Sequence, residues 1–344
     1  MQGVVKYQRG DGFTELRDVD VRKPNASEVL IEVHSAGICG SDLHIHHDHI
    51  NLPMRPPVVI GHEFSGTIIE CGSEITRVKV GDRVTVEPTF SICGRCDYCR
   101  SGFYNLCNHR EIIGYWHNGA FAKYCTTPET GLHKLPENVD LTSGSLTEPL
   151  ACCVHGVIEQ TQVSAGDFVV ITGPGTIGLL SLQIAKAEGG IVAVCGTSVD
   201  ANRLKRAAEL GADLTLDVEK EDAVEVIKAH TGGYGADVVL ECSGAAPAAP
   251  LGIELTRKRG KYTQMGLFGN PINIDFEQIA FKELQVTGFI SQKKTAWERA
   301  LKLMEHGMVS TKALVTHEMH ISEWQEAFDL FERREGVKLM LRPE

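Results

Sequence analysis

The sequence predicts an α/β protein with a β-rich first domain followed by a doubly wound parallel sheet. The 344 residues suffice for about two domains of ordinary size. The first half consists of short β segments separated by Gly and Pro. Beyond residue 150, apolar strands alternate with helical patterns, and a glycine-rich turn joins the first of these strands to its helix.

In the first half, β-branched and apolar runs between turn residues indicate strands at 29–33, 66–70 and 82–86. We expect them to belong to a β-rich domain over residues 1–151. Four cysteines crowd into residues 93–107 and predict a separate lobe within it.

The second half begins with a continuous apolar run at 168–172, typical of a parallel strand that is buried on both faces. Such strands, alternating with helices, imply βαβ units and a second domain over residues 152–289. The final segment, 290–344, is expected to return to the first domain. Further strands are expected at 191–195, 214–218, 237–242, 261–265 and 337–341, and helices at 176–188, 200–210, 221–230, 296–306 and 322–334.

The composition excludes several classes of protein. With 42% hydrophobic and 23% charged residues, the chain is typical of a globular enzyme. A net charge of -11 leaves no basic face for nucleic acid. There is no apolar run of about 18 residues for a membrane span. Residues 1–7 lack the pattern of a secretory leader, so we expect a cytoplasmic protein.

The cysteine lobe has the spacing Cys-x2-Cys-x2-Cys-x7-Cys, formed by Cys93, Cys96, Cys99 and Cys107. Four thiolates complete a tetrahedral zinc shell and leave no open position, so a structural zinc is predicted. An iron–sulfur cluster has similar spacing but is usually followed by Pro, where this chain has Asn108.

The glycine-rich turn fits the pattern G-x-G-x-x-G between a strand and a helix, which predicts a Rossmann-type dinucleotide site. The first glycine allows the tight turn, the second admits the pyrophosphate, and the third permits close packing of helix on sheet. The turn comprises Gly173, Pro174, Gly175, Thr176, Ile177 and Gly178.

The second strand of this domain leaves the choice between NAD and NADP open. An acidic residue should follow it to hold the ribose hydroxyls of NAD, but the strand runs into Gly196, Thr197 and Ser198. These small residues would admit the 2′-phosphate of NADP, with Arg203 near enough to pair with it. Alternatively, Asp200 reaches the ribose after a longer turn and Arg203 is a surface charge.

Three further segments offer ligands for a second, catalytic zinc. Such a site needs three protein ligands and one exchangeable position. Cys39, His62 and a carboxylate, Glu63 or Glu148, would supply them.

Together, these segments, the cysteine lobe and the glycine-rich turn resemble the zinc-dependent medium-chain dehydrogenases over essentially the whole chain. Glu148-Pro149-Leu150 is more similar to the polyol (sorbitol) and threonine dehydrogenases than to the liver-type alcohol dehydrogenases, which have Cys at the position of Glu148. The resemblance implies a GroES-like fold for the first domain. It makes Cys39 and His62 zinc ligands, with Glu63 and Glu148 sharing the remaining role directly or through water.

The resemblance also implies roles for residues around the two sites. Ser41 would accept the proton of the alcohol and pass it through the cofactor ribose towards His44. His46, His47 and His49, with Asp48, form a loop bordering the pocket. Cys152 and Cys153 are rival ligands to Glu148, although we interpret them as small core residues. Trp116 and Phe121 are expected to line the substrate cleft, and Cys242, Gly266, Phe289 and Ser291 to lie beside the cofactor.

The expected function is oxidation of a secondary alcohol of a polyol or sugar alcohol to a ketone, with NAD or NADP and two zinc ions per chain. The alternatives are an L-threonine or amino-alcohol dehydrogenase and a sugar-alcohol-phosphate dehydrogenase. A non-catalytic zinc-containing binding protein is the alternative from another class. A homo-oligomer, dimer or tetramer, is expected by analogy with the family.

Overall fold

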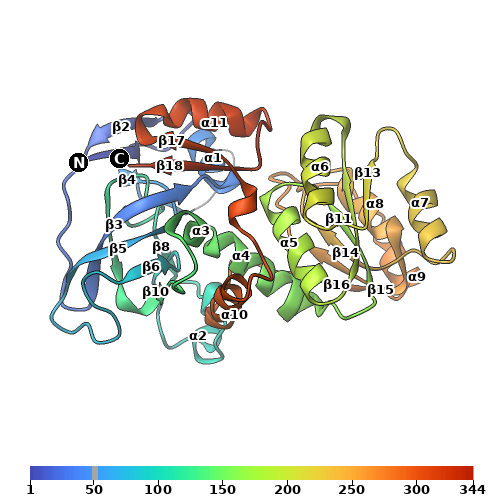
Figure 1. Cartoon of the computed structure of the whole chain (residues 1–344), viewed down its shortest axis with the longest axis horizontal. Coiled ribbons are helices and arrows are strands. Elements are labelled where there is room, and N and C mark those ends of the chain that lie inside the picture. Colours follow the sequence, from blue (N-terminus) through green and yellow to red (C-terminus); the bar gives the residue numbers. More distant parts are fainter. Residues whose placement is uncertain (49–52, 344) are drawn as a thin grey trace. The chain divides into compact units, whose positions relative to one another are not determined.

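The computed structural model describes residues 1–48 and 53–343, and His49 lies outside these ranges. The chain divides into two compact units (Figure 1). Unit 1 comprises Met1–Glu148, Lys293–Glu305 and the segment from Thr311 onward, and unit 2 comprises Pro149–Gln292 and His306–Ser310. These divisions lie a few residues from the expected boundaries at 151 and 289.

Unit 1 is rich in β-strands, as the short turn-bounded segments predicted, and most of its strand pairs are antiparallel. Its main sheet has the order β10-β6-β5-β3-β18-β17, with β9 also paired to β3. A second sheet has the order β2-β1-β4, and β7 pairs with β8. The strands are β1 (Gln2–Lys6), β2 (Thr14–Asp18), β3 (Glu28–Gly37), β4 (Val58–Val59), β5 (Glu63–Cys71), β6 (Arg83–Val86), β7 (Thr89–Ser91), β8 (Glu111–Ile112), β9 (Tyr124–Pro128), β10 (Leu132–Lys134), β17 (Val315–His320) and β18 (Lys338–Arg342).

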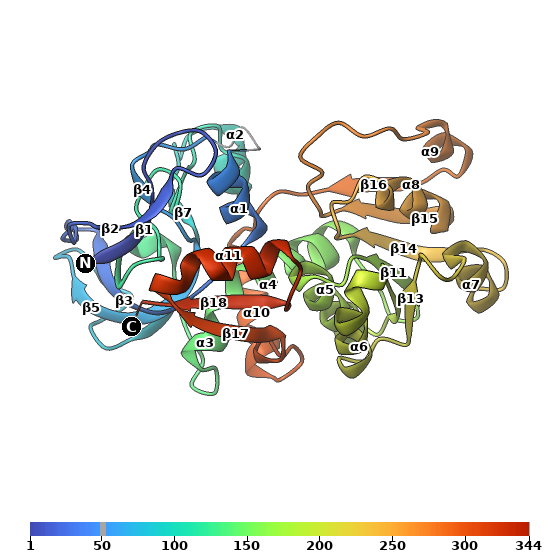
Figure 2. The ribbon, with the colours of Figure 1, turned by 90° about the horizontal axis from the view of Figure 1, so that it is seen from above.

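The C-terminal segment completes the main sheet of unit 1. β18 pairs antiparallel with β3, and β17 extends the sheet in parallel. Figure 2 shows α11 lying along these two strands. The helices of this unit are α1 (Gly40–His47), α2 (Asp97–Arg100), α3 (Leu141–Ser145), α10 (Lys294–Glu305) and α11 (Trp324–Glu332).

Unit 2 is a doubly wound parallel sheet with the order β13-β12-β11-β14-β15-β16. Helices α5 and α6 pack on β11, β12 and β13, while α8 packs on β11, β14 and β15. The strands are β11 (Phe168–Thr172), β12 (Ile191–Gly196), β13 (Leu214–Asp217), β14 (Ala236–Glu241), β15 (Thr256–Gln264) and β16 (Gln285–Gly288). The helices are α5 (Thr176–Ala187), α6 (Ala201–Glu209), α7 (Ala223–His230), α8 (Ala248–Leu255) and α9 (Glu277–Phe281), and α4 (Thr147–Val154) leads into the unit from unit 1.

The apolar run that predicted β11 is fully buried, because helices cover both faces of a doubly wound sheet. Val170, Ala193 and Val239, from three neighbouring strands, have no exposed surface and form one cluster. Each buried Val or Leu side chain contributes about 1.5–3 kcal/mol relative to its exposed state. No described helix is long and apolar enough to cross a bilayer.

Part of the histidine loop joins three elements of unit 1. His47 lies at the end of α1. Its Nδ1 is 2.7 Å from Asp11 Oδ1, and its Nε2 is 2.5 Å from Glu332 Oε1 on α11. Partial burial lowers the pKa of His47, but the hydrogen bonds with Asp11 and Glu332 raise it by more, so the net shift is upward.

This raised pKa predicts a pH-dependent contribution to stability. The contribution is complete below the unfolded-state pKa of about 6.5 and is lost as the pH rises through the higher folded-state value. His47→Gln should therefore lower the melting temperature at pH 5 and have little effect at pH 9. His230→Gln, at an exposed histidine on α7, is the control. Equal effects of His47→Gln at both pH values would contradict this account.

Candidate active site

Cys39 and His62 are positioned by the start of α1 and by the segment before β5. Cys39 immediately precedes α1, and its backbone N–H donates to Asp42 Oδ2 at 2.9 Å. The other oxygen of this fully buried carboxylate lies 3.4 Å from His62 Nδ1. Asp42 thus lies on the Nδ1 side of the ring, while Nε2 faces Ser41. A carboxylate beside the nitrogen that does not bind the metal is common among metal-bound histidines.

Glu63, the first residue of β5, completes a group of three donors. The Cys39 thiol, a His62 ring nitrogen and a Glu63 carboxylate oxygen all lie within 4.8 Å of one another. Buried thiolate, imidazole and carboxylate groups are the ligands that zinc binds in catalytic sites. The three residues therefore fit a zinc ion with one open position.

The Glu63 carboxylate is also paired with a lysine that was not predicted. Lys338, at the start of β18, forms an ion pair with Glu63 Oε2 and donates to Ile38 O at 2.8 Å. Both side chains are 2% exposed. Burial lowers the pKa of Lys338, but the negative charges of Glu63 and Cys39 raise it by more, so the ammonium is held in its charged form.

Glu148 lies near this group without belonging to it. It is the second residue of α4, it is buried, and its carboxylate is not among the three donors that cluster within the described chain. Burial and the negative charge of Glu63 raise the pKa of Glu148 to about 7. The Glu63 and Glu148 carboxylates are thus close enough to interact, as they must be if both take part in binding one zinc ion.

Ser41 and Tyr115 face His62. Ser41 Oγ lies 3.4 Å from His62 Nε2, and the Tyr115 ring meets the imidazole edge to face at 5.6 Å. Tyr115 also hydrogen-bonds with the Ser41 side chain, and burial raises the pKa of its phenol to about 12. His44 follows Ser41 by one turn of α1 and is half-buried. Sequence reasoning missed Tyr115 and named its neighbour Trp116.

Trp116 and Phe121 lie elsewhere in unit 1. Trp116 lines a cavity of about 210 Å³ together with Met1, Arg22 and Tyr124. Phe121 is fully buried in the core, where a Cβ on Gly61 would approach its ring to 2.5 Å. Packing accounts for Phe121, so its expected place in a substrate cleft has no support from this geometry.

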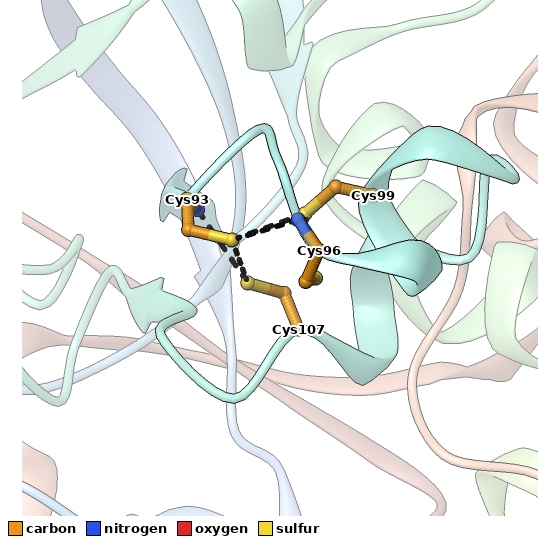
Figure 3. Close-up of side chains that lie close together, drawn as sticks. All are labelled: Cys93, Cys96, Cys99 and Cys107. Carbon is orange, nitrogen blue, oxygen red and sulfur yellow. Dashed lines mark hydrogen bonds between the residues drawn. The ribbon is translucent and has the colours of Figure 1, made fainter.

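The four lobe cysteines converge on one point (Figure 3). The Sγ–Sγ distance is 3.5 Å between Cys96 and Cys99 and 3.6 Å between Cys93 and Cys107. It is 3.9 Å between Cys93 and Cys99. Tetrahedral zinc with Zn–S bonds of about 2.3 Å requires sulfurs about 3.8 Å apart. Backbone N–H groups of Arg95 and Cys96 lower the pKa of Cys93 to about 6, which favours the thiolate that binds zinc.

In unit 2, the glycine-rich turn has the backbone that its sequence predicted. Gly173 has φ +92°, where a Cβ would lie 2.7 Å from the Cα of Ser243. A Cβ on Gly178 would lie 2.0 Å from Gly173 O, so only glycine allows this packing. Gly175 precedes α5, and a Cβ there would meet open space. Pro174, Thr176 and Ile177 complete the turn, which presents the α5 N-terminus to an anionic ligand.

The turn after β12 is held by acidic side chains. Asp200 Oδ2 accepts hydrogen bonds from Thr197 N at 3.1 Å and Thr197 Oγ1 at 2.9 Å, and its Oδ1 lies 3.5 Å from Arg203 Nη1. Ser198 Oγ donates to Asp217 at 2.8 Å. Gly196 packs against Pro174 of the glycine-rich turn. Asp200 therefore caps its own turn.

The other expected cofactor residues lie at or near the carboxyl ends of the unit 2 strands. Cys242 and Gly266 follow β14 and β15, and Phe289 follows β16 and contacts Gly156 and His155. Ser291 has φ +58° and bonds to Gln292. Cys152 donates to Gln292 Oε1 at 3.5 Å and Cys153 to Ile177 O at 3.4 Å, so both thiols bond to other residues of unit 2, to which they belong.

Comparisons with known proteins identify two family domains in the chain. Residues 25–137 match the model of the alcohol dehydrogenase GroES-like domain, and residues 176–306 match that of the zinc-binding dehydrogenases. A sorbitol dehydrogenase of Halalkalibacterium halodurans is 48% identical, and the match covers 100% of this chain and 99% of that protein. A D-arabitol-phosphate dehydrogenase of Enterococcus avium is 41% identical, covering 99% and 97%.

Solved structures share the whole fold. A Sinorhizobium meliloti structure, described as a zinc-binding dehydrogenase bound to NADP, is 32% identical with a TM-score of 0.91 over 99% of both chains. The chain therefore belongs to the zinc-binding alcohol dehydrogenase family, in the branch of the polyol and threonine dehydrogenases. It is an enzyme, an NAD(P)-dependent alcohol dehydrogenase.

Proposed function

We propose that this enzyme oxidises a secondary alcohol of a polyol to a ketone at a zinc ion held by Cys39, His62 and Glu63, with Glu148 as an alternating or water-mediated ligand. The observation that carries the proposal is the cluster of three donor atoms within 4.8 Å of one another, with His62 and Glu63 buried and Cys39 half-buried. A second, structural zinc would be held by the cysteine lobe.

The residues around the cluster have separate tasks. Bound zinc would supply the Lewis acidity that makes an alcohol hydroxyl easy to deprotonate, and the nicotinamide would accept the hydride. Ser41 Oγ, between His62 and Tyr115, would take up the alcohol proton, and His44 would carry it towards solvent. Asp42 would lie against the His62 ring, and Lys338 would hold the Glu63 carboxylate in place.

The polyol substrate is supported by the two relatives at 48% and 41% identity, which act on sorbitol and on D-arabitol phosphate. The test is a screen of sorbitol, other polyols, polyol phosphates, L-threonine and simple alcohols, each with NAD and with NADP. Polyol-dependent cofactor reduction is expected to be the fastest reaction. Absence of any reduction by zinc-replete protein would refute the proposal.

We further propose that Arg203 binds the 2′-phosphate of NADP, because Asp200 caps its own turn and the small residues Gly196, Thr197 and Ser198 lie at the end of β12 and just after it, where NAD enzymes place an acid. Arg203→Ala should weaken NADPH binding by about tenfold or more and leave NADH binding within about twofold. Fluorescence titration of the two reduced cofactors measures both. Arg206→Ala, at a partly exposed arginine on the same helix, is the matched control. Equal losses for NADH and NADPH would contradict this role.

We also propose a cytoplasmic homodimer or homotetramer that pairs through β16. Within the described residues, this strand ends the sheet and has a neighbour on one side only. Val286 on the strand and Phe276 and Phe281 beside it are exposed, forming the kind of open edge that pairs with a second copy. Light scattering should give a multiple of 37.6 kDa, and Val286→Lys should reduce it. A monomeric wild-type protein would contradict the proposal.

A further inference from the structure

A buried carboxylate lies where the parallel sheet of unit 2 changes winding direction. β11 is flanked by β12 on one side and by β14 on the other, so the switch point lies between β11 and β14. Ligands of doubly wound sheets bind at the carboxyl ends of the strands at this point. Glu241 is the last residue of β14 and has no exposed surface.

The Glu241 side chain accepts hydrogen bonds from the ends of three strands. Oε1 accepts from Ser243 N at 2.9 Å, from Thr172 Oγ1 at 3.3 Å and from the Ser243 hydroxyl. Gly244 N lies 3.1 and 3.2 Å from the two oxygens. Oε2 accepts from Gln264 Nε2 at 2.6 Å. One carboxylate therefore joins the ends of β11, β14 and β15.

The turns joined by Glu241 are packed against the glycine-rich turn and against each other. Gly173 approaches Ser243 so closely that a Cβ would lie 2.7 Å from the Ser243 Cα. A Cβ on Gly266 would lie 2.3 Å from Gly244 N and 2.8 Å from Glu241 Oε2. A shift of Ser243 or Gly244 must therefore move Gly173 or Gly266, because these turns approach too closely to leave room for even a Cβ between them.

We propose that Glu241 is a positioning residue of the cofactor site, whose carboxylate fixes the turns at Gly173, Ser243–Gly244 and Gly266 that approach the nicotinamide dinucleotide. This inference rests on the proposed dehydrogenase function. It assigns to Glu241 no contact with the reacting atoms. Its effect on the cofactor is transmitted through the backbone of these turns.

The carboxylate of Glu241 is needed because both of its oxygens can accept hydrogen bonds. Glutamine keeps the shape but replaces one oxygen by an NH2 group, which cannot accept a hydrogen bond from Ser243, Gly244 or Gln264. At least one buried donor then loses its partner, which destabilises and displaces the turn.

The same strand offers a matched control. Asp237, near the other end of β14, accepts from Phe168 N on β11 at 2.8 Å and from Arg257 Nε on β15 at 2.6 Å. Asp237 and Glu241 thus brace the same three strands at opposite ends. Asp237→Asn should lower stability without reaching the cofactor edge.

The experiment measures dissociation constants of NADH and NADPH by fluorescence titration of wild type, Glu241→Gln and Asp237→Asn, with thermal unfolding of each protein. Glu241→Gln is expected to weaken binding of the tighter cofactor by about tenfold. Asp237→Asn is expected to leave it within about twofold, although both variants melt at lower temperature. If Glu241→Gln does not fold, the same measurement is made on Gln264→Leu. This variant removes one hydrogen-bond partner of the Glu241 carboxylate and should weaken binding of the same cofactor.

Unchanged binding by Glu241→Gln, or by Gln264→Leu in its place, would overturn the role of Glu241. Equal weakening by Asp237→Asn would overturn it as well, because the effect would then follow stability alone. Failure of the wild type to bind either cofactor would instead refute the proposed function, so the two failures are distinguishable.

Discussion

Cys39→Ala is expected to remove one zinc ion per chain and to lower alcohol oxidation by roughly 10³-fold or more. The thiolate is one of three protein donors, and a site reduced to two no longer holds the ion well. Loss of the Lewis acid removes several kcal/mol of transition-state stabilisation. Metal analysis and initial rates on the same samples measure both effects. The cysteine lobe is a separate cluster, so its zinc should remain bound.

Cys152→Ala is the control for this change. Cys152 follows Glu148 closely in sequence and was a rival ligand, but its thiol contacts Gln292. The variant should retain full zinc content and most of the activity. Loss of zinc from Cys152→Ala, with full zinc in Cys39→Ala, would reverse the ligand assignment.

Lys338→Met is expected to destabilise the protein by about 3–5 kcal/mol, because it leaves the Glu63 carboxylate buried without its cation. Urea unfolding measures this loss. Adding Glu63→Gln should restore part of the stability, since the remaining side chain is then neutral. Zinc content, measured in the same samples, separates the loss of the ion pair from any loss of metal.

An exposed lysine–carboxylate pair provides the comparison. Lys312 and Asp140 lie 2.9 Å apart, with side chains 72% and 46% exposed. Lys312→Met should cost much less than Lys338→Met, because solvent screens the exposed pair. Similar losses for Lys338→Met and Lys312→Met would show that burial does not set the strength of the Glu63 pair.

The alternation of strands and helices in the nucleotide-binding half could be predicted from sequence, although α8 and α9 were not predicted. Phe168–Thr172 forms the expected strand with the expected bounds, and helix α5 ends one residue before its predicted end. Continuous apolar runs and glycine turns are local signals, so they can be recognised without knowing which strands pair. β15 was predicted too short. Its first half is irregular and contains the charged residues Arg257, Lys258 and Arg259, which do not form the apolar run expected of a buried strand.

The site was predictable where its chemistry depends on residue type and spacing. The cysteine lobe and the trio of Cys39, His62 and Glu63 assemble as those residues indicated. Tyr115 and Lys338 could not be found in this way. Lys338 reaches Glu63 only because β18 pairs with β3, and no local pattern reports a contact between residues so far apart in the chain.

The most direct test of the account is graded removal of zinc by a chelator, with zinc content and polyol-dependent reduction of NAD or NADP measured on each sample. The account predicts about two zinc ions per chain in the intact enzyme. Activity should disappear as the content falls from about two to about one, and should return when zinc is added back. Full activity in protein that has lost all its zinc would contradict a catalytic centre at Cys39, His62 and Glu63.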